Sequence, residues 1–168
     1  VTASNIPLKV GVISYSSKKN ARIKYVDKQE KPLRDLDGYP GAKPPWGTLT
    51  AMNLNTGKIK WQVSLGYYES LKAKGIITGT ENFGGATATA GGVVFAAGTL
   101  DKLIRAFDSE NGQELWSYKL PYIGSAPPTI YEINGEQYIV IPASGGMILK
   151  VLYKDLVEQG DAVVAFKI

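Results

Sequence analysis

Two glycine pairs, each next to a large apolar residue, are the features of this sequence best suited to hold a ligand. They are Phe83-Gly84-Gly85 and Gly145-Gly146-Met147. Glycine lets the backbone come close to a planar ligand, and a large apolar side chain beside it can pack on the ligand's edge or face. Glycine pairs also form bulges and tight turns, and the residues alone favour that structural interpretation.

The residue types that are missing exclude several chemistries. The 168 residues contain neither histidine nor cysteine. Without thiols, the chain cannot form disulfides, thiolate metal sites or a thiol nucleophile. Without imidazole, it lacks the commonest general base and cannot build a Ser/His/Asp triad by itself. Its Asp and Glu residues show no calcium-loop spacing, so the residues alone indicate no calcium site.

Composition narrows the class of protein further. The net charge is only +4, and the lysines and arginines are scattered or interleaved with acids. No aromatic-basic stripe accompanies them, so we do not expect nucleic-acid binding. No run of about 18 or more apolar residues could span a membrane. The chain starts at Val1 without a signal peptide, and we therefore expect it to be a segment of a longer protein.

Short apolar runs between turn formers predict an all-β chain. Residues 83–120 hold three such runs, which are bounded by Gly-Gly, Gly-Thr-Leu-Asp and Asn-Gly. The whole stretch predicts a four-stranded antiparallel meander. A hairpin is expected on each side of this meander: Thr48–Asn53 with Ile59–Leu65, and Pro128–Ile133 with Gln137–Pro142.

The ends of the chain are expected to be less regular. Leu8–Tyr15 is predicted as a strand, and the charge density of residues 17–37 favours a solvated loop. One short helical turn is expected at Glu69–Ala73. Ala162–Ile168 is predicted as a last strand whose partners come from another blade or from the N-terminal end of the longer protein.

The turn of the central meander occurs twice. Ala106–Trp116 matches Ala51–Trp61 at an offset of 55 residues, with Ala, Asn or Asp, Gly and Trp at the same places. Residues 161–166 resemble the strand that carries Ala106-Phe107 and form an incomplete third copy. Several short strands repeated at about 40–60 residues are typical of a β-propeller. The alternative is two hairpins of one sandwich that share a turn.

The repeated pattern, Ala-x-Asp/Asn-x-x-Thr/Asn-Gly-x-x-x-Trp, resembles the tryptophan-docking motif of propellers that bind pyrroloquinoline quinone (PQQ). The runs PPWGTLTAMNLNTGKIKWQVSLG and TGTENFGGATATAGGVVFAAGTLDKLIRAFD resemble the C-terminal part of PQQ-dependent sugar and alcohol dehydrogenases, in particular the membrane-bound glucose dehydrogenase branch. The resemblance implies an all-β partial propeller with about two and a half to three four-stranded blades out of about eight. It divides the chain into a partial blade (1–65, with the charged loop 17–46), a full blade (83–120) and an incomplete last blade (126–168).

The same resemblance assigns residues to a cofactor chamber. Family loops with aromatic-Gly-Gly and Gly-Gly-aromatic sequences line that chamber, which implies PQQ contacts for Phe83, Gly84, Gly85, Gly145, Gly146 and Met147. Met147 replaces the second aromatic residue. Asn5 corresponds to a family asparagine near the cofactor, and Asp101 to an aspartate of the glucose dehydrogenase branch. An aspartate in a hairpin turn is the alternative for Asp101.

The repeat residues are expected to be structural. Trp61 and Trp116 should each dock on the neighbouring blade, burying the indole ring while its N–H finds a backbone acceptor. Asp108 and Asn53 should cap the two turns through their side-chain oxygens.

The function implied by the resemblance is oxidation of a sugar or polyol by PQQ, assisted by Ca²⁺. The resemblance also implies that the catalytic base and the Ca²⁺ ligands lie in blades N-terminal to Val1, so no catalytic or metal-ligating residue is expected within this chain. It also implies a periplasmic location, transfer of electrons to the quinone pool, and assembly with the remaining blades of the parent protein. Exposed blade faces further predict self-association of the isolated chain. The alternative is a non-catalytic propeller scaffold for protein contacts, which Phe83-Gly84-Gly85 and the sequence between the repeats argue against.

Overall fold

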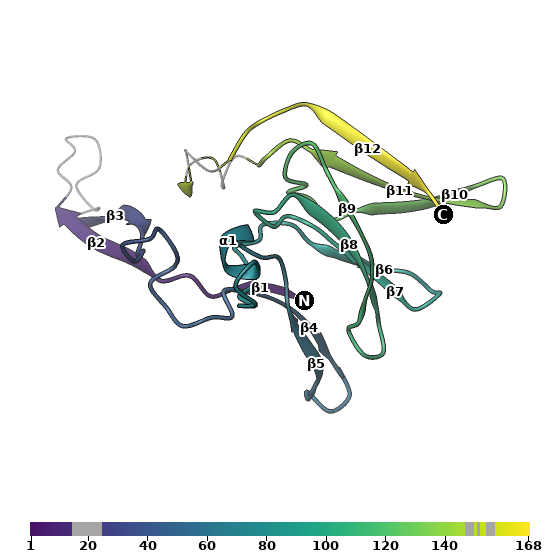
Figure 1. Ribbon diagram of the computed structural model, residues 1–168, viewed down its shortest axis with the longest axis horizontal. Coiled ribbons are helices and arrows are strands. Elements are labelled where there is room, and N and C mark those ends of the chain that lie inside the picture. The colour runs from purple at the N-terminus through teal and green to yellow at the C-terminus, as the bar shows by residue number, and fades with distance from the viewer. Residues whose placement is uncertain (15–24, 147–149, 151, 154–156) are drawn as a thin grey trace. The chain divides into compact units, whose positions relative to one another are not determined.

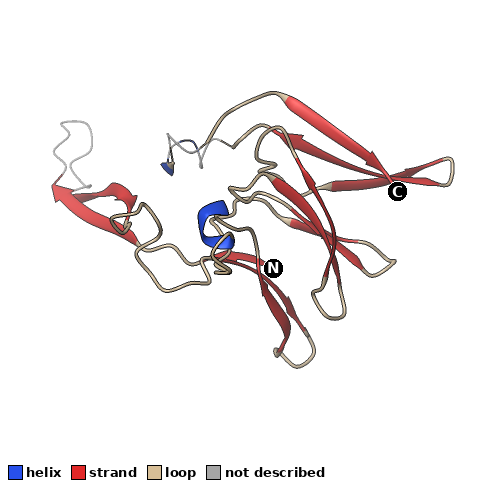
Figure 2. Ribbon diagram, viewed as in Figure 1, coloured by secondary structure: helices blue, strands red, loops and turns tan. Residues whose placement is uncertain are grey.

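The computed structural model describes residues 1–14, 25–146, 150, 152–153 and 157–168, and Met147 lies outside them. The chain forms two compact units, Val1–Asn5 with Pro44–Ile168, and Ile6–Lys43. Both consist mostly of antiparallel strands, which confirms the all-β prediction (Figure 1). The short helix α1 (Glu69–Lys72) lies where a helical turn was predicted (Figure 2).

A four-stranded antiparallel sheet forms the complete blade of the larger unit. Consecutive strands are neighbours in it, as predicted for residues 83–120. The strands are β6 (Ala86–Ala88), β7 (Val93–Ala96), β8 (Leu103–Asp108) and β9 (Glu114–Lys119). Alanine, threonine, valine and phenylalanine make up β6 and β7, and burial increases from the largely exposed β6 to Phe95 and Ala96 of β7.

Two three-stranded sheets complete this unit. The first has the order β1 (Thr2–Ser4), β4 (Gly47–Met52) and β5 (Ile59–Ser64). The second has the order β10 (Thr129–Ile133), β11 (Glu136–Ala143) and β12 (Ala162–Lys167). The two predicted hairpins are therefore confirmed.

The last strand corrects one expectation. β12 pairs along its whole length with β11, from Tyr138–Lys167 to Ala143–Ala162, and needs no partner from another blade. β12 is the third strand of its sheet, as β8 is in the complete blade. The resemblance of residues 161–166 to the strand carrying Ala106-Phe107 thus reflects an equivalent place in the sheet.

The smaller unit is a two-stranded ribbon. β2 (Leu8–Ser14) pairs with β3 (Tyr25–Pro32) in antiparallel register. The expectation of a loop over residues 17–37 is therefore wrong for β3. The charges that favoured a loop are compatible with this strand, because a two-stranded ribbon leaves its side chains accessible to solvent.

The core lies between successive sheets of the larger unit. One cluster joins Leu49 and Leu65 to Ala96 and Phe107 of the complete blade. A second cluster contains residues of the complete blade and of the β10–β12 sheet: Phe95, Ala97, Ile104, Ala106, Leu120, Ile139, Ile141 and Ala143. Each sheet is thus covered by the apolar face of the next, which is how propeller blades pack.

The two repeated turns are built alike. Asn53 Oδ1 accepts hydrogen bonds from the amides of Asn55 (3.0 Å) and Thr56 (3.2 Å). Asp108 Oδ1 accepts equivalent bonds from the amides of Glu110 (2.6 Å) and Asn111 (3.3 Å). The caps predicted for Asn53 and Asp108 are therefore present in both copies.

The two repeat tryptophans differ. Trp61 Nε1 donates a hydrogen bond of 2.9 Å to the carbonyl of Ser109, in the turn of the next sheet. Trp116 makes no such bond to the described residues, is 40% exposed, and packs edge-on against Phe166 at 5.2 Å. Trp116 thus contacts the next sheet through Phe166 of β12, as predicted, but the predicted burial of its ring and the predicted N–H bond to a backbone acceptor are wrong among the described residues, because no described turn meets its ring as the Ser109 turn meets Trp61.

Candidate functional site

The predicted site residues lie in connections at one end of the sheets. Because consecutive strands of the complete blade are antiparallel, the connections before β6 and between β7 and β8 emerge at the same end. The connection after β11 lies at this end too, since the Gly145 amide binds the carbonyl of Ile123, and Leu100 of the β7–β8 connection packs against the cluster of Ile123. These connections carry Phe83–Gly85, Asp101 and Gly145-Gly146. The Asn53 and Asp108 turns lie at the opposite end. The topology thus brings three of the predicted segments together.

Asn5 reaches the same end through β1. Ser4 pairs with Gly47 at the start of β4, and Asn5 donates its main-chain N–H to the carbonyl of Trp46 at 2.8 Å. The segment before Phe83 binds this strand, since the Asn82 amide donates to Ser4 Oγ at 3.0 Å and Asn82 Nδ2 to the Ala3 carbonyl at 2.9 Å. The exposed side chain of Asn5 therefore follows a strand that is joined to the Phe83 segment.

Phe83 provides an aromatic ring at this end of the sheets. Its amide donates to the Gly98 carbonyl at 3.2 Å, and its side chain is 38% exposed. Phe83 belongs to none of the apolar clusters formed by the described residues. A partly exposed ring held by a backbone hydrogen bond is suited to pack against a planar ligand.

Gly84 and Gly85 are close to other parts of the chain. A Cβ at Gly84 would lie 2.3 Å from the Ala97 carbonyl oxygen, and one at Gly85 would lie 2.5 Å from Pro127 Cγ. The close neighbours of this glycine pair in the structure are protein, whereas the prediction concerned a planar ligand and stays a prediction. Gly84 lets the Phe83 segment pack on the loop after β7, and Gly85 lets it pack on the segment before β10.

Gly145 and Gly146 follow β11 with positive φ angles of +84° and +73°. The Gly145 amide donates to the Ile123 carbonyl at 2.9 Å, and a Cβ at Gly145 would lie 2.1 Å from the Glu158 carbonyl oxygen. Ile123 also belongs to an apolar cluster against which Leu100 packs. These contacts connect the second glycine pair to the loop that carries Asp101.

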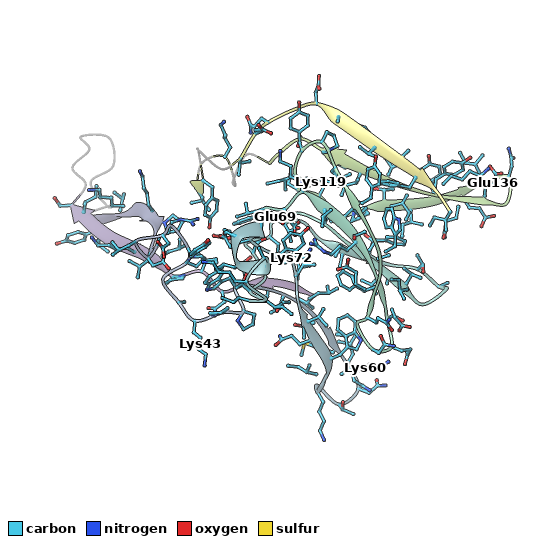
Figure 3. The ribbon with its side chains drawn as sticks, viewed as in Figure 1. Lys43, Lys60, Glu69, Lys72, Lys119 and Glu136 are labelled. Carbon is cyan, nitrogen blue, oxygen red and sulfur yellow. The ribbon has the colours of Figure 1, made fainter. Side chains whose placement is uncertain are left out.

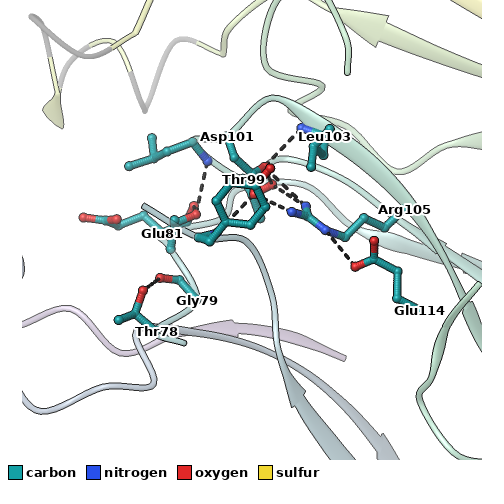
Figure 4. A network of polar contacts seen from close by, with 11 residues as sticks. Thr78, Gly79, Glu81, Thr99, Asp101, Leu103, Arg105 and Glu114 are labelled. Carbon is teal, nitrogen blue, oxygen red and sulfur yellow. Dashed lines mark hydrogen bonds and ion pairs between the residues drawn. The ribbon is translucent and has the colours of Figure 1, made fainter. Parts of the chain in front are cut away.

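Asp101 is the most completely bonded residue of the predicted set. Its side chain is 1% exposed and forms an ion pair with Arg105, whose side chain is 3% exposed (Figure 4). The carboxylate also accepts hydrogen bonds from Thr99 Oγ1 at 2.6 Å and from two backbone amides, Tyr67 at 3.1 Å and Leu103 at 3.1 Å. The bond to the Leu103 amide, two residues on, is the local turn contact that the alternative for Asp101 anticipated.

Sequence analysis did not assign a role to Arg105, Thr99 or Glu81. Arg105 was visible as the one charge within the apolar run Leu103–Phe107, which is a signal of a buried partner. Its Nε lies 3.2 Å from Glu114 Oε2, and its Nη1 donates to Thr99 Oγ1 at 3.1 Å. Glu81 is fully buried and accepts a hydrogen bond of 2.6 Å from the Tyr68 hydroxyl, a contact that nothing in the sequence indicated.

The arrangement fits one edge of a site for a planar cofactor. Phe83 offers a ring face, Asn5 an exposed side-chain amide, and the surrounding loops are fixed by backbone hydrogen bonds. Within the described residues no three His, Cys, Asp or Glu side chains are grouped to hold a metal ion. The described chain can therefore contact such a ligand from one side, and it shows no metal centre.

Comparison with known proteins agrees with this architecture. Residues 9–139 match the family model described as "PQQ: Glucose/ethanol/alcohol dehydrogenase, beta-propeller domain". The quinate/shikimate dehydrogenase (quinone) of Acinetobacter baylyi is 38% identical over 137 residues, which cover 77% of this chain and 16% of that protein. The quinoprotein glucose dehydrogenase of Escherichia coli is 38% identical over 135 residues, covering 77% and 16%.

A solved structure shows the same fold. The quinohemoprotein alcohol dehydrogenase of Comamonas testosteroni superposes with a TM-score of 0.57 at 25% identity, covering 77% of this chain and 17% of that one. The chain thus spans about a sixth of the length of the curated relatives named above. Its three sheets of the larger unit are a part of a β-propeller.

The family match covers most of the chain, and it includes the Phe83 segment, the Asp101 loop and both repeats. The relatives agree with it in sequence and the solved structure agrees in fold. The chain therefore belongs to the β-propeller family of PQQ-dependent glucose, ethanol and alcohol dehydrogenases.

Proposed function

We propose that this chain is part of a PQQ-dependent dehydrogenase that oxidises a sugar or polyol, and that it forms one side of the cofactor chamber. The observation that carries the proposal is the partly exposed ring of Phe83 at the end of the sheets, within a sequence that matches the family. The family match and the loops around Phe83 favour an enzyme over a non-catalytic scaffold.

Each residue of the candidate site has a distinct part in this proposal. Phe83 packs against the cofactor, and apolar contact of this kind contributes about 1–3 kcal/mol. Asn5 offers its side-chain amide to a polar edge. Gly84, Gly85, Gly145 and Gly146 fix the paths of the surrounding loops, and the family resemblance alone proposes a cofactor contact for Met147. Asp101 supports the Phe83 segment from behind.

When bound, PQQ supplies the two-electron acceptor for oxidation of the substrate hydroxyl. The residues of this chain bind and orient it, and they keep one side of the chamber dry through the apolar clusters beneath the loops. The base that removes the hydroxyl proton and the ligands of a bound Ca²⁺ belong to the remaining blades of the parent protein. In this proposal electrons leave for the quinone pool, and the enzyme works in the periplasm.

The described residues contain no helix long and apolar enough to cross a membrane. Association with the remaining blades would cover the outer faces of the first and last sheets, which carry exposed apolar residues such as Ile59 and Val163. The isolated chain should self-associate through the same faces, because apolar surface that lacks its partner blade favours contact with another copy.

The test is substrate oxidation by the longer protein that carries this segment. The apoprotein is mixed with PQQ and Ca²⁺, and reduction of an electron-accepting dye is followed with glucose, glycerol, quinate and ethanol. We expect dye reduction that requires PQQ and is fastest with a sugar or polyol. PQQ binding without oxidation of any of the four would contradict the proposed activity, and oxidation of ethanol alone would contradict the substrate class.

A further inference from the structure

A buried ion pair lies directly behind the candidate site. Arg105 comes from the middle of β8, and Asp101 from the loop before it (Figure 4). Both side chains are almost completely buried, at 3% and 1% exposure. A buried charge pair persists when its geometry is good and its remaining donors and acceptors are satisfied. The other hydrogen bonds of Asp101 and Arg105 show which segments the ion pair holds in place.

Asp101 accepts hydrogen bonds from two backbone amides and one side-chain hydroxyl through its two oxygens. Oδ2 accepts the Tyr67 amide at 3.1 Å, from the connection between β5 and β6. Oδ1 accepts the Leu103 amide at 3.1 Å, at the start of β8. Oδ1 also accepts the Thr99 hydroxyl at 2.6 Å. With Arg105 added, both oxygens are occupied by protein donors.

Thr99 carries the connection on to the Phe83 segment. Its hydroxyl accepts a hydrogen bond from Arg105 Nη1 at 3.1 Å while donating to Asp101. Its backbone forms a bridge with Asn82, and the carbonyl of the preceding residue, Gly98, accepts the Phe83 amide at 3.2 Å. The ion pair is therefore connected to the Phe83 segment through the Thr99 hydroxyl and the backbone contacts of Gly98 and Thr99.

We propose that Arg105 is a positioning residue for the Phe83–Gly85 segment and acts through Asp101 and Thr99. The expected effect of Arg105 on cofactor binding rests on the proposed function. The effect of Arg105 on the position of the Phe83–Gly85 segment does not depend on it. In this proposal Asp101 supports the loops of the cofactor site and does not contact the ligand. Contact with a ligand would require one of the protein groups that now donate hydrogen bonds to its carboxylate to leave.

Access to Arg105 from solvent makes the proposal directly testable. A pocket of about 270 Å³ is lined by Arg105, Glu114, Tyr67 and Lys72 among others. Replacing Arg105 by alanine would open a void onto this pocket. A free guanidinium ion could enter that void and bind Asp101 in the place of the lost side chain.

The main experiment measures amide hydrogen exchange in the 168-residue chain for wild type and Arg105→Ala. Exchange at Tyr67, Leu103 and Phe83 should become at least about tenfold faster, because all three amides depend on the Asp101 and Thr99 positions. Exchange in the β11–β12 ladder should change much less. Low concentrations of guanidinium should restore protection at the three amides, while equal concentrations of tetramethylammonium should not.

Thr99→Val provides a second variant that leaves no buried charge unpaired. Thr99 connects Asp101 and Arg105 to the Phe83 segment, whereas the Tyr67 amide binds Asp101 directly. Exchange should therefore accelerate at Phe83 while Tyr67 keeps its bond to Asp101. Lys60→Ala is the matched control, since it removes an exposed ion pair with Glu110, which lies in the Asp108 turn at the opposite end of the sheets. Equal acceleration of all amides in Arg105→Ala, or unchanged exchange at Phe83 in both variants, would overturn the proposal.

PQQ titration of the longer protein separates this inference from the proposed function. We expect Arg105→Ala to bind PQQ more weakly, and guanidinium to restore the affinity. If wild type binds PQQ and Arg105→Ala binds it equally well, the positioning role is overturned. If wild type does not bind PQQ but exchange responds as described, the proposed function fails and the geometric role of Arg105 remains.

Discussion

Phe83 and Phe107 are the same residue type in two different environments. Phe83 is 38% exposed at the loop end of its sheet, while Phe107 is 2% exposed in the cluster formed with Leu49, Leu65 and Ala96. A ring that the fold does not bury is available for a ligand. A ring in a core cluster mainly stabilises the packing of two sheets.

We therefore predict opposite stability effects for the same substitution. Phe107→Ala should destabilise the chain by about 3–5 kcal/mol, as for removal of a buried ring. Phe83→Ala should cost less than about 1.5 kcal/mol, because a partly exposed side chain loses little packing. Denaturant unfolding of both variants without cofactor checks this, and a larger loss for Phe83→Ala would show that its ring belongs to the core.

Glu136 offers a prediction about pH at the residue scale. It lies near the turn between β10 and β11 (Figure 3), and its Oε1 is 2.5 Å from Lys167 Nζ of β12. The hydrogen bond from Lys167, followed by that from the Tyr138 hydroxyl, lowers the pKa of Glu136 below its ordinary value of 4.5. A lowered pKa in the folded state means that the contribution to stability is present above pH 4.5 and is lost as the pH falls through the folded-state pKa.

Glu136→Gln should therefore melt earlier than wild type at neutral pH, with a difference that disappears in acid. Thermal melts from about pH 7 to about pH 3 measure this difference. Lys167→Gln should behave in the same way, because it removes the same ion pair from the other side. A difference between wild type and Glu136→Gln that stays constant through acid pH would show that the ion pair is not its cause.

Asp101 shows how far single residues could be interpreted from sequence. The turn and the family resemblance both drew attention to Asp101, but its partner Arg105 is four residues away on the next strand. The contact between Asp101 and Arg105 depends on the path of the loop from Gly98 to Lys102. Gly98 and Lys102 both have positive φ angles. Such a loop path is set by packing against the Phe83 and Tyr67 segments, and the local sequence does not specify it.

At the scale of elements, the two repeated turns allow the same glycine position to be compared with and without a contact to the neighbouring sheet. Gly57 and Gly112 hold the same place in the repeat, with φ angles of +68° and +75°. A Cβ at Gly57 would meet nothing within 4 Å, whereas one at Gly112 would lie 2.6 Å from the Trp61 ring. The backbone demand is shared by both glycines, and only Gly112 has the additional contact with the neighbouring sheet.

We predict that Gly57→Ala costs about 1–2 kcal/mol, the strain of a left-handed conformation for a residue with a Cβ. Gly112→Ala should cost about 1–3 kcal/mol more, because overpacking against Trp61 is added to the same strain. Chemical denaturation of the two variants gives the difference. Equal losses would mean that the Trp61 contact with the Ser109–Gly112 turn contributes nothing to joining the sheets.

Prediction from sequence succeeded for elements with clear local signals and failed where pairing partners decide the outcome. Alternating apolar residues and Asn-Gly turns were enough to locate β8, β9, β10 and β11. β3 carries a run of charges that favours a loop, and only its pairing with β2 makes it a strand. The partner of β12 is separated from it by the connection after Ala143, so no short-range pattern identified it.

At the scale of the whole molecule, the chain corresponds to a part of the β-propeller of its relatives. Its larger unit contains one four-stranded and two three-stranded sheets, joined by apolar clusters between successive sheets. The chain spans about a sixth of the relatives described above. A chamber built by several blades is expected to be incomplete in this chain alone.

We therefore predict that the 168-residue chain does not reduce dye with glucose, even when PQQ and Ca²⁺ are supplied. The residues of the described chain include no metal-binding cluster, and the proposed base lies in other blades. Adding the remaining blades as a separate polypeptide should create activity. Dye reduction by the purified chain alone would show that the catalytic groups are present in it.

The central claim is that the Phe83 side of the sheets faces PQQ, and PQQ titration of the longer protein tests it most directly. Wild type, Phe83→Ala and Phe107→Ala are compared as apoproteins, at a temperature where all three remain folded. Phe83→Ala should weaken binding by about 1–3 kcal/mol, or about 5- to 150-fold in Kd, through lost apolar contact. Folded Phe107→Ala should bind almost as wild type does. If Phe83→Ala binds PQQ as tightly as wild type, the ring does not face the cofactor and the account is contradicted.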